Sequence, residues 1–400
     1  MVEIWVPYGP VEVSFDIKQE NLSQILEPQP SILAREEIES RLDSVTADTL
    51  LLLSGSNGSL KALDTLLTRN KGVTKILYPK NLGALARRKA QEYTIQAEQL
   101  NEQALEESGI VEGSNVKVPA QLKSTPKLVL LTSVHYDPMY GLSSAASDML
   151  SCVIDLKGQA FNRSIDELPC TSVFSSAASE YAIKVLQTCP SVDTIEVVEK
   201  TSTGLLNLFY GDIESVHSQT ASYWTKNMAV GFASKVERIL FGCGGQEGDK
   251  TLTDALGRSY FNMISNVALD DSRICMLAEC TQGLGSEAFL RYATGRFTPG
   301  ANLDAISYFD GVETLLSLLK IQRQKNVEMN LVSTLPYYFA ERFGFKPISA
   351  ARDAPSSVVQ LGSRAKILVV PDGSSIFFGE NSTPETTSGV GISSDQTPLP

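Results

Sequence analysis

Histidine is nearly absent from this sequence of 400 residues, which contains only His135 and His217. Two imidazoles leave little room for a histidine-built metal site or for a pair of histidines in acid-base catalysis. Cysteine is also sparse. The six cysteines form no Cys-x-x-Cys pair, so the sequence predicts neither a disulfide framework nor a zinc ribbon.

Basic residues are scarce as well, with 34 Lys and Arg against 46 Asp and Glu and a net charge of −12. Nucleic acids and anionic membrane surfaces require a basic face, so we expect neither as a partner. No stretch reaches 18 uninterrupted apolar residues, and the start of the chain lacks the pattern of a secretory signal. These features predict a cytoplasmic protein.

Short apolar runs alternate with helical stretches along the chain. Leu50–Leu53 and Thr74–Tyr78 flank such a stretch, and the same alternation starts again at Val236–Phe241. Continuous apolar strands separated by helices indicate parallel sheets. We therefore predict an α/β fold with two domains, each a mostly parallel sheet flanked by helices, and a ligand cleft between them. The predicted domains cover residues 1–230 and 231–380, and residues 381–400, which lack Lys and Arg, form a predicted disordered tail.

A different pattern occupies residues 82–107. Apolar residues follow one another at intervals of four and three, which predicts a long helix with a narrow apolar seam: Ala86, Ala90, Tyr93, Ala97, Leu100 and Ala104. Packing on the surface of its own domain is one interpretation. A partner-binding or dimer-forming helix is the other.

Two segments at strand ends could carry chemistry. A polar, glycine-containing loop opens a predicted helix, and its backbone amides could hold a phosphate or carboxylate, although a plain tight turn is the alternative: Ser54, Gly55, Ser56, Asn57 and Gly58. His135 and Asp137 follow the strongest predicted strand, Lys127–Val134, where α/β proteins bind ligands. They could act as a base and its orienting group, or make ordinary hydrogen bonds at a strand end.

Several blocks of the sequence resemble the nickel-pincer lactate racemases. These blocks are VPYGPVEVSFDIKQENLSQILEP, ICMLAECTQGLGSEAF, LVSTLPYYFAERFGFKPI and AKILVVPDGSSI, and the likeness extends over most of residues 1–375. The resemblance implies a two-domain α/β fold and the racemisation of a hydroxy acid. It also implies a nickel complex on a nucleotide-derived cofactor that is tethered to a lysine, and two histidines that exchange the hydroxyl proton.

The motifs that carry this chemistry are altered in the present sequence. By the resemblance, Asp137 stands at a histidine, Ser147 at the tethering lysine and Arg163 at a nickel-ligand histidine. Serine has no amine for the tether, and a charged arginine is a poor nickel ligand. The glycines Gly55 and Gly58 replace an Asp and an Arg, Leu82 lies near another expected histidine, and Asp254 and Gly257 replace a Gln and a Lys.

The resemblance therefore predicts a racemase fold without the nickel cofactor and without any metal. Such a protein would be non-catalytic or would bind a small anionic ligand in the cleft, through the loop of residues 54–58 and through Ser143, Ser144, Ser147, Arg163, Gly244, Gly245 and Asp249. One alternative is a racemase- or epimerase-type isomerase that uses His135 and Asp137. A second is an interaction subunit that uses the helix of residues 82–107. No oligomeric state follows from the sequence.

Overall fold

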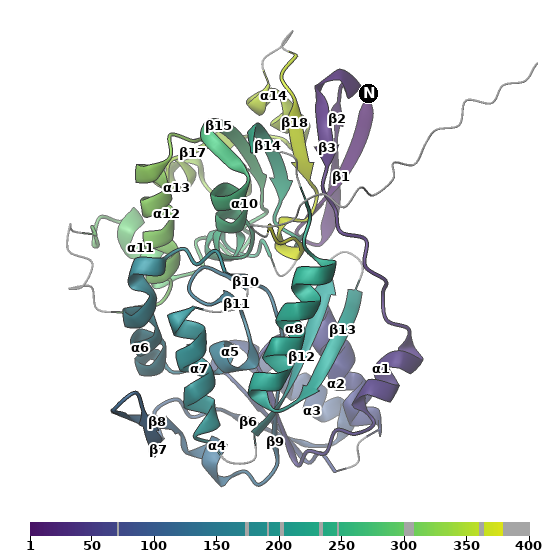
Figure 1. Cartoon of the computed structure of the whole chain (residues 1–400), viewed down its shortest axis with the longest axis vertical. Coiled ribbons are helices and arrows are strands. Elements are labelled where there is room, and N and C mark those ends of the chain that lie inside the picture. The colour runs from purple at the N-terminus through teal and green to yellow at the C-terminus, as the bar shows by residue number, and fades with distance from the viewer. Residues whose placement is uncertain are drawn as a thin grey trace, which may run out of the picture.

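The computed structural model describes residues 1–69, 72–172, 176–189, 192–200, 204–231, 235–245, 248–299, 308–359 and 364–378. Figure 1 shows two lobes, each built on one sheet with helices against it. The predicted tail, residues 381–400, lies outside the described residues. Within the described part of the chain, no helix is both long and apolar enough to cross a bilayer.

The first lobe contains a six-stranded sheet in which only the pairing of β12 with β13 is antiparallel. Its strands, in spatial order, are β13 (Gly204–Gly211), β12 (Val192–Lys200), β9 (Leu128–Ser133), β4 (Thr49–Leu52), β5 (Lys75–Tyr78) and β6 (Gln96–Gln99). Every residue of β4 and β9 is buried, as expected for strands that are covered on both faces.

The covering elements of the first lobe come mostly from the connections between its strands. They are α1 (Arg35–Leu42), α2 (Asn57–Arg69), η2 (Lys80–Leu82), α3 (Gly83–Tyr93), α4 (Ala120–Ser124), α5 (Ala145–Ser151), α6 (Ile154–Ser164), η3 (Ile165–Glu167), α7 (Ala177–Gln187) and α8 (Ile213–Asn227). Two hairpins complete the lobe: β7 (Leu105–Val111) with β8 (Ser114–Pro119), and β10 (Tyr136–Asp137) with β11 (Gly141–Leu142).

The second lobe contains a six-stranded sheet in which all pairs are parallel. Its strands, in spatial order, are β17 (Phe345–Ile348), β16 (Glu328–Val332), β15 (Ala268–Leu277), β14 (Val236–Gly242), β18 (Ile367–Val370) and β3 (Leu22–Ile25). The hairpin of β1 (Val2–Tyr8) and β2 (Val11–Ile17) lies beside this sheet (Figure 1).

The helical elements of the second lobe are short. They are η1 (Gln19–Asn21), α9 (Leu252–Ala255), the π-helical η5 (Leu256–Tyr260), α10 (Phe261–Asn266), α11 (Glu287–Ala293), α12 (Val312–Gln324), α13 (Tyr337–Arg342), η6 (Ala351–Asp353), α14 (Ala354–Val358) and η7 (Gly373–Ser375). A continuous helix is expected over residues 253–267 from the sequence, and the structure interrupts it with the π-helical turn.

The predicted α/β fold with two mostly parallel sheets is confirmed. The sheets divide the chain near residue 230, with one exception. Strand β3 pairs with β18, so the first residues of the chain complete the sheet of the second lobe. The division into two domains as such stays a prediction.

The long helix expected over residues 82–107 is wrong. Helix α3 ends at Tyr93, and Thr94 adopts the left-handed conformation with φ 57°. Residues 96–99 then form β6, which pairs in parallel with the edge of β5 over four residues, so the helix does not continue. Leu100 is buried beyond that strand, so the seam that suggested a partner helix is not one surface.

Candidate functional site

The candidate site lies where the carboxyl ends of β9 and β12 meet the second lobe. Val134 and Val198 at these ends pack in one cluster with Phe377, which follows β18. Hairpin β10–β11 extends from the end of β9 and lies between the lobes in Figure 1. A Cβ on Gly257 of η5 would lie 3.7 Å from Pro138 in this hairpin.

The loop of residues 54–58 already holds a carboxylate, which comes from the protein itself. The Gly58 N–H donates to Glu199 Oε2 at 2.6 Å, and the Ser133 hydroxyl donates to Glu199 Oε1 at 2.5 Å. The strand bulges between Val198 and Glu199, and bulges redirect the side chains that follow them. The expected anion cradle is therefore filled from β12, and Ser56 caps α2 by accepting the Ser59 N–H at 3.1 Å. The side chains of Ser54 and Asn57 do not contact Glu199 in any hydrogen bond between described residues.

The serines at the start of α5 form a helix cap. The Ser144 hydroxyl accepts the Ser147 N–H at 3.2 Å, and the Ser147 hydroxyl accepts the Ser144 N–H at 2.7 Å while donating to the Ser144 carbonyl at 2.9 Å. Buried Glu196, also on β12, accepts the Ala145 N–H at 3.0 Å. The Ser147 hydroxyl is thus fully used within the cap.

His135 is held by a serine and a carbonyl. Its Nδ1 lies 3.3 Å from the Ser133 carbonyl and 3.1 Å from Ser143 Oγ, and its backbone N–H donates to the same hydroxyl at 2.9 Å. The contact with the carbonyl requires the tautomer that carries the proton on Nδ1, in which Nε2 presents its lone pair, whereas the Ser143 hydroxyl can pair with either tautomer. Burial lowers the pKa of His135 to about 3, and the charge of Arg258 adds to this, so the imidazole is neutral.

Asp137 has a different role from the one expected. Its Oδ1 accepts the N–H groups of Met139 and Tyr140 at 2.8 and 3.0 Å, which shapes the turn between β10 and β11. Burial raises its pKa, as does the charge of Glu313, while Lys157 opposes the shift. Among the described residues, no hydrogen bond joins Asp137 to His135.

Sequence reasoning missed Asp148 and also Arg258, whose charge acts on both His135 and Asp148. Arg258 projects from the π-helical η5 of the second lobe, and Asp148 lies on α5, where it accepts a short hydrogen bond from the Thr132 hydroxyl. Burial raises the pKa of Asp148 to about 7, although the Thr132 hydrogen bond and Arg258 act in the other direction. Arg258 is half-buried and makes no hydrogen bond or ion pair with any described residue. The only sequence signal for Arg258 was its place inside an expected helix, and a π-helical turn leaves no clear pattern.

The expected site residues of the second lobe hold its loops together. Gly244 and Gly245 have φ values of +85° and +67°, and a Cβ on Gly244 would lie 1.9 Å from Ser374 Oγ. Asp249 Oδ2 accepts the N–H of Gly9 at 2.8 Å and that of Glu279 at 3.2 Å. Asp249 therefore anchors the β1–β2 turn, and burial raises its pKa.

Arg163 interacts with residues outside this site. Its Nε lies 2.9 Å from Glu112 Oε2, and its guanidinium carbon is 3.9 Å from the centre of the Tyr181 ring. The structure thus brings together residues 54–58, Ser143, Ser147 and His135 around the ends of β4, β9 and β12, and it does not place Arg163 among them. No group of three or more His, Cys, Asp or Glu is arranged to hold a metal ion anywhere in the described ranges.

Comparison with solved structures identifies the fold. The apoprotein of lactate racemase from Thermoanaerobacterium thermosaccharolyticum superposes with a TM-score of 0.69 at 16% identity, covering 95% of this chain and all of that one. A structural-genomics protein from Thermotoga maritima gives a TM-score of 0.62 at 12% identity and covers 88% of this chain and 99% of its own. No protein-family model and no curated protein sequence matches. The chain has a lactate-racemase-like fold, as the sequence blocks predicted.

Proposed function

We propose that this protein binds a small anionic ligand at the lobe junction and does so without the nickel cofactor of the lactate racemases. Arg258 is the observation that carries the proposal. Arg258 is half-buried and has no hydrogen-bond or ion-pair partner among the described residues, so none of these residues accepts a hydrogen bond from its five N–H donors. A ligand carboxylate or phosphate would supply both the acceptors and the opposite charge.

The neighbours of Arg258 suit a ligand that also carries a hydroxyl group. His135 is neutral and presents the Nε2 lone pair, so it accepts a hydrogen bond from such a hydroxyl. Asp148, with a pKa raised to about 7, loses its repulsion toward an anion when it takes up a proton. The ligand affinity should therefore rise as the pH falls through 7.

The residues at the cofactor positions do not fit the nickel nucleotide. Ser147, which the resemblance puts at the tethering lysine, has no amine, and its hydroxyl is used within the α5 cap. Arg163, at the position of a nickel ligand, is paired with Glu112. Glu196 and Glu199 occupy the helix starts on either side, and their charges oppose any phosphate brought there.

The test measures anion binding by calorimetry for phosphate, acetate, glycolate and both lactate enantiomers. Arg258→Met, which keeps the aliphatic stem, should weaken binding about 10- to 100-fold, since a hydrogen bond to a charged group contributes roughly 1.5–3 kcal/mol. Arg88→Met removes an exposed arginine of α3 and is the matched control.

Three results would contradict the proposal. Equal affinities of the Arg258→Met variant and the wild type would remove its basis. Stoichiometric nickel after co-expression with the enzymes that make the cofactor would show that the cofactor does bind. Interconversion of the lactate enantiomers would favour the isomerase alternative.

A further inference from the structure

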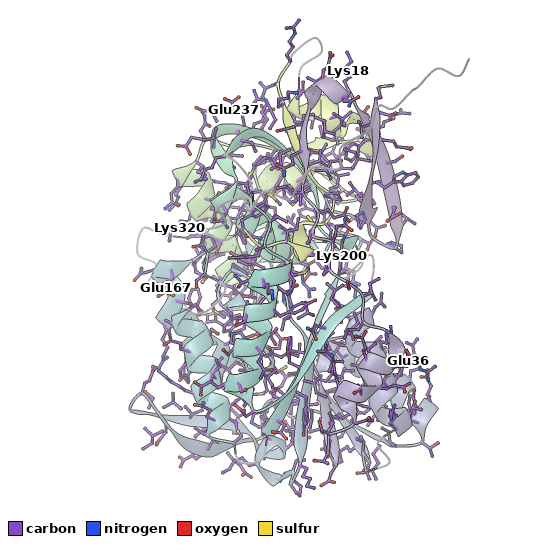
Figure 2. The ribbon with its side chains drawn as sticks, turned by 45° about the vertical axis from the view of Figure 1, so that its right-hand side comes forward. Lys18, Glu36, Glu167, Lys200, Glu237 and Lys320 are labelled. Atoms are coloured by element: carbon purple, nitrogen blue, oxygen red, sulfur yellow. The ribbon has the colours of Figure 1, made fainter. Side chains whose placement is uncertain are left out.

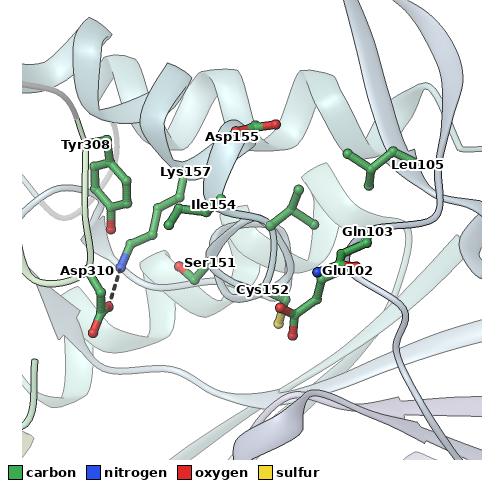
Figure 3. A pocket seen from close by; sticks show the side chains of 11 residues that line it. Glu102, Gln103, Leu105, Ser151, Cys152, Ile154, Asp155, Lys157, Tyr308 and Asp310 are labelled. Atoms are coloured by element: carbon green, nitrogen blue, oxygen red, sulfur yellow. Dashed lines mark ion pairs between the residues drawn. The ribbon is translucent and has the colours of Figure 1, made fainter. Parts of the chain in front are cut away.

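A second cavity lies apart from Arg258, where the first turn of α6 meets the segment before α12. Its volume is about 340 Å³, and Figure 3 shows its walls. The first lobe contributes residues around Glu102 and the junction of α5 with α6, and the second lobe contributes Tyr308 and Asp310. A cavity of this size, with walls from both lobes, holds a small organic molecule.

Among the described residues that line the cavity, Lys157 is the one basic residue, and the protein already neutralises it. Its Nζ lies 3.0 Å from Glu313 Oε1 and 4.0 Å from Asp310 Oδ1. The negative charges of Glu313 and Asp310 outweigh burial and hold the pKa of Lys157 well above its usual value. Lys157 therefore stays cationic and paired, and it does not attract an anion into the cavity.

The remaining charges of the wall are negative. Glu102, Asp155 and Asp310 line the cavity, and none of their carboxylates accepts a hydrogen bond from a described residue. Figure 3 shows Glu102 and Asp310 on opposite sides, with Ser151 and Cys152 between them. The charge of the wall favours a ligand with positive charge at both ends.

The same wall also has an apolar side. Leu105, Val153 and Ile154 line it, and the Ile154 side chain is 59% exposed although it is large and apolar. Next to Lys157, Glu313 Oε2 and the Tyr308 hydroxyl are buried and have no hydrogen-bond partner within the described part of the chain. An exposed apolar side chain beside polar groups that lack a partner indicates that a bound molecule covers this wall of the cavity.

We propose that this cavity binds a linear aliphatic diamine, with one ammonium group at Asp310, the other at Glu102 and the methylene chain along Ile154 and Leu105. The aliphatic stem matches the apolar side, and the two charges match the separated carboxylates. An ammonium group donates three hydrogen bonds, which the exposed carboxylates of Glu102 and Asp310 accept, the latter beside its 4.0 Å ion pair with Lys157. The site does not include Arg258, so its test is separate from the test of the anion site.

The test uses calorimetry on the full-length protein at constant ionic strength. Pentane-1,5-diamine should bind, whereas the isosteric pentane-1,5-diol and the dianion glutarate should not bind in this cavity. Glu102→Gln with Asp310→Asn should weaken diamine binding about tenfold, since each exposed ion pair contributes up to about fivefold. The control is Glu12→Gln with Glu36→Gln, which removes the same charge from exposed positions on β2 and α1 outside the cavity wall; Figure 2 labels Glu36.

Three outcomes would overturn the proposal. The diamine could bind no better than the diol, in which case the charges of the wall do not matter. Both double variants could weaken binding equally, which would mean that only the net charge of −12 attracts the diamine. Glutarate could bind and lose affinity in Lys157→Met, which would make the cavity an anion site.

Discussion

At the scale of single residues, the lobe junction brings together titratable and charged side chains that lie far apart in the sequence. Arg258 of the second lobe acts by its charge on His135 and Asp148 of the first lobe, and it opposes proton uptake by both. The imidazole stays neutral, the carboxyl titrates near neutrality and the guanidinium stays charged. This set of charge states suits binding and proton uptake better than metal ligation.

Asp148 makes the stability of the protein depend on pH. Its pKa is about 7 in the folded protein against 3.8 ordinarily, so the folded state binds more protons than the unfolded chain between these values. Stability from this residue is therefore lost as the pH rises from about 4 to 7. Asp148→Asn should be more stable than the wild type at pH 8, by on the order of 1–4 kcal/mol, and should match it near pH 4.

Thermal unfolding across this pH range measures the difference. Asp16→Asn, on the exposed face of β2, is the control and should run parallel to the wild type at every pH. If Asp148→Asn also ran parallel to the wild type, the pKa of Asp148 would be the same in the folded and unfolded protein, and its charge would be better compensated than the contacts indicate.

At the scale of elements, β12 explains why the expected anion loops are filled. Glu196 and Glu199 lie three positions apart on this strand, and the bulge after Val198 turns the second of them toward α2. One strand thus supplies carboxylates to the first turns of both α2 and α5, where the N–H groups of a helix favour negative charge.

The end of α3 offers a prediction at the same scale. Thr94 has φ 57°, and a left-handed conformation costs a residue with a Cβ about 1–2 kcal/mol. Thr94→Gly should therefore stabilise the protein by about 0.5–1 kcal/mol after the entropy cost of glycine. Urea unfolding measures this, and Thr94→Ala, which keeps the Cβ, should show no such gain. A loss of stability in Thr94→Gly would mean that contacts of the threonine side chain outweigh the strain.

At the scale of the whole molecule, the two lobes share one core. A single cluster of buried side chains runs from Leu130 and Tyr140 of the first lobe to Phe241 and Leu331 of the second. Lys200 and Glu27 form an ion pair of 2.5 Å beside this junction, and Figure 2 shows Lys200 at the waist of the molecule. We expect the lobes to unfold together.

Phe377 tests this coupling. It follows β18 and packs with Val134 and Trp224 of the first lobe. Phe377→Ala should lower the free energy of unfolding by about 3–5 kcal/mol, and Phe377→Leu should lower it less, because the cavity that it leaves is smaller.

The variant Trp5→Phe keeps Trp224 as its remaining tryptophan, and in this variant fluorescence and circular dichroism should report one shared unfolding midpoint. Two separate midpoints would show that the lobes unfold independently.

The sequence by itself determined most elements and the fold class. Leu128–Ser133 and Val236–Gly242 are strands because continuous apolar runs require burial on both faces, which is a local property of the chain. The blocks that resemble lactate racemases predicted the fold before the structure showed it. The alteration of the cofactor motifs stays a prediction from the resemblance.

Only the tertiary structure decided which groups meet. Glu199 accepts a hydrogen bond from Gly58, which lies 141 positions earlier in the chain. Arg258 acts on His135 from the other lobe. The helix predicted at residues 82–107 failed for the same reason, because the free edge of β5 offered pairing that the helical pattern does not encode. Periodicity reports which face of a segment is buried, whereas charge pairing depends on contacts between segments that only folding brings together.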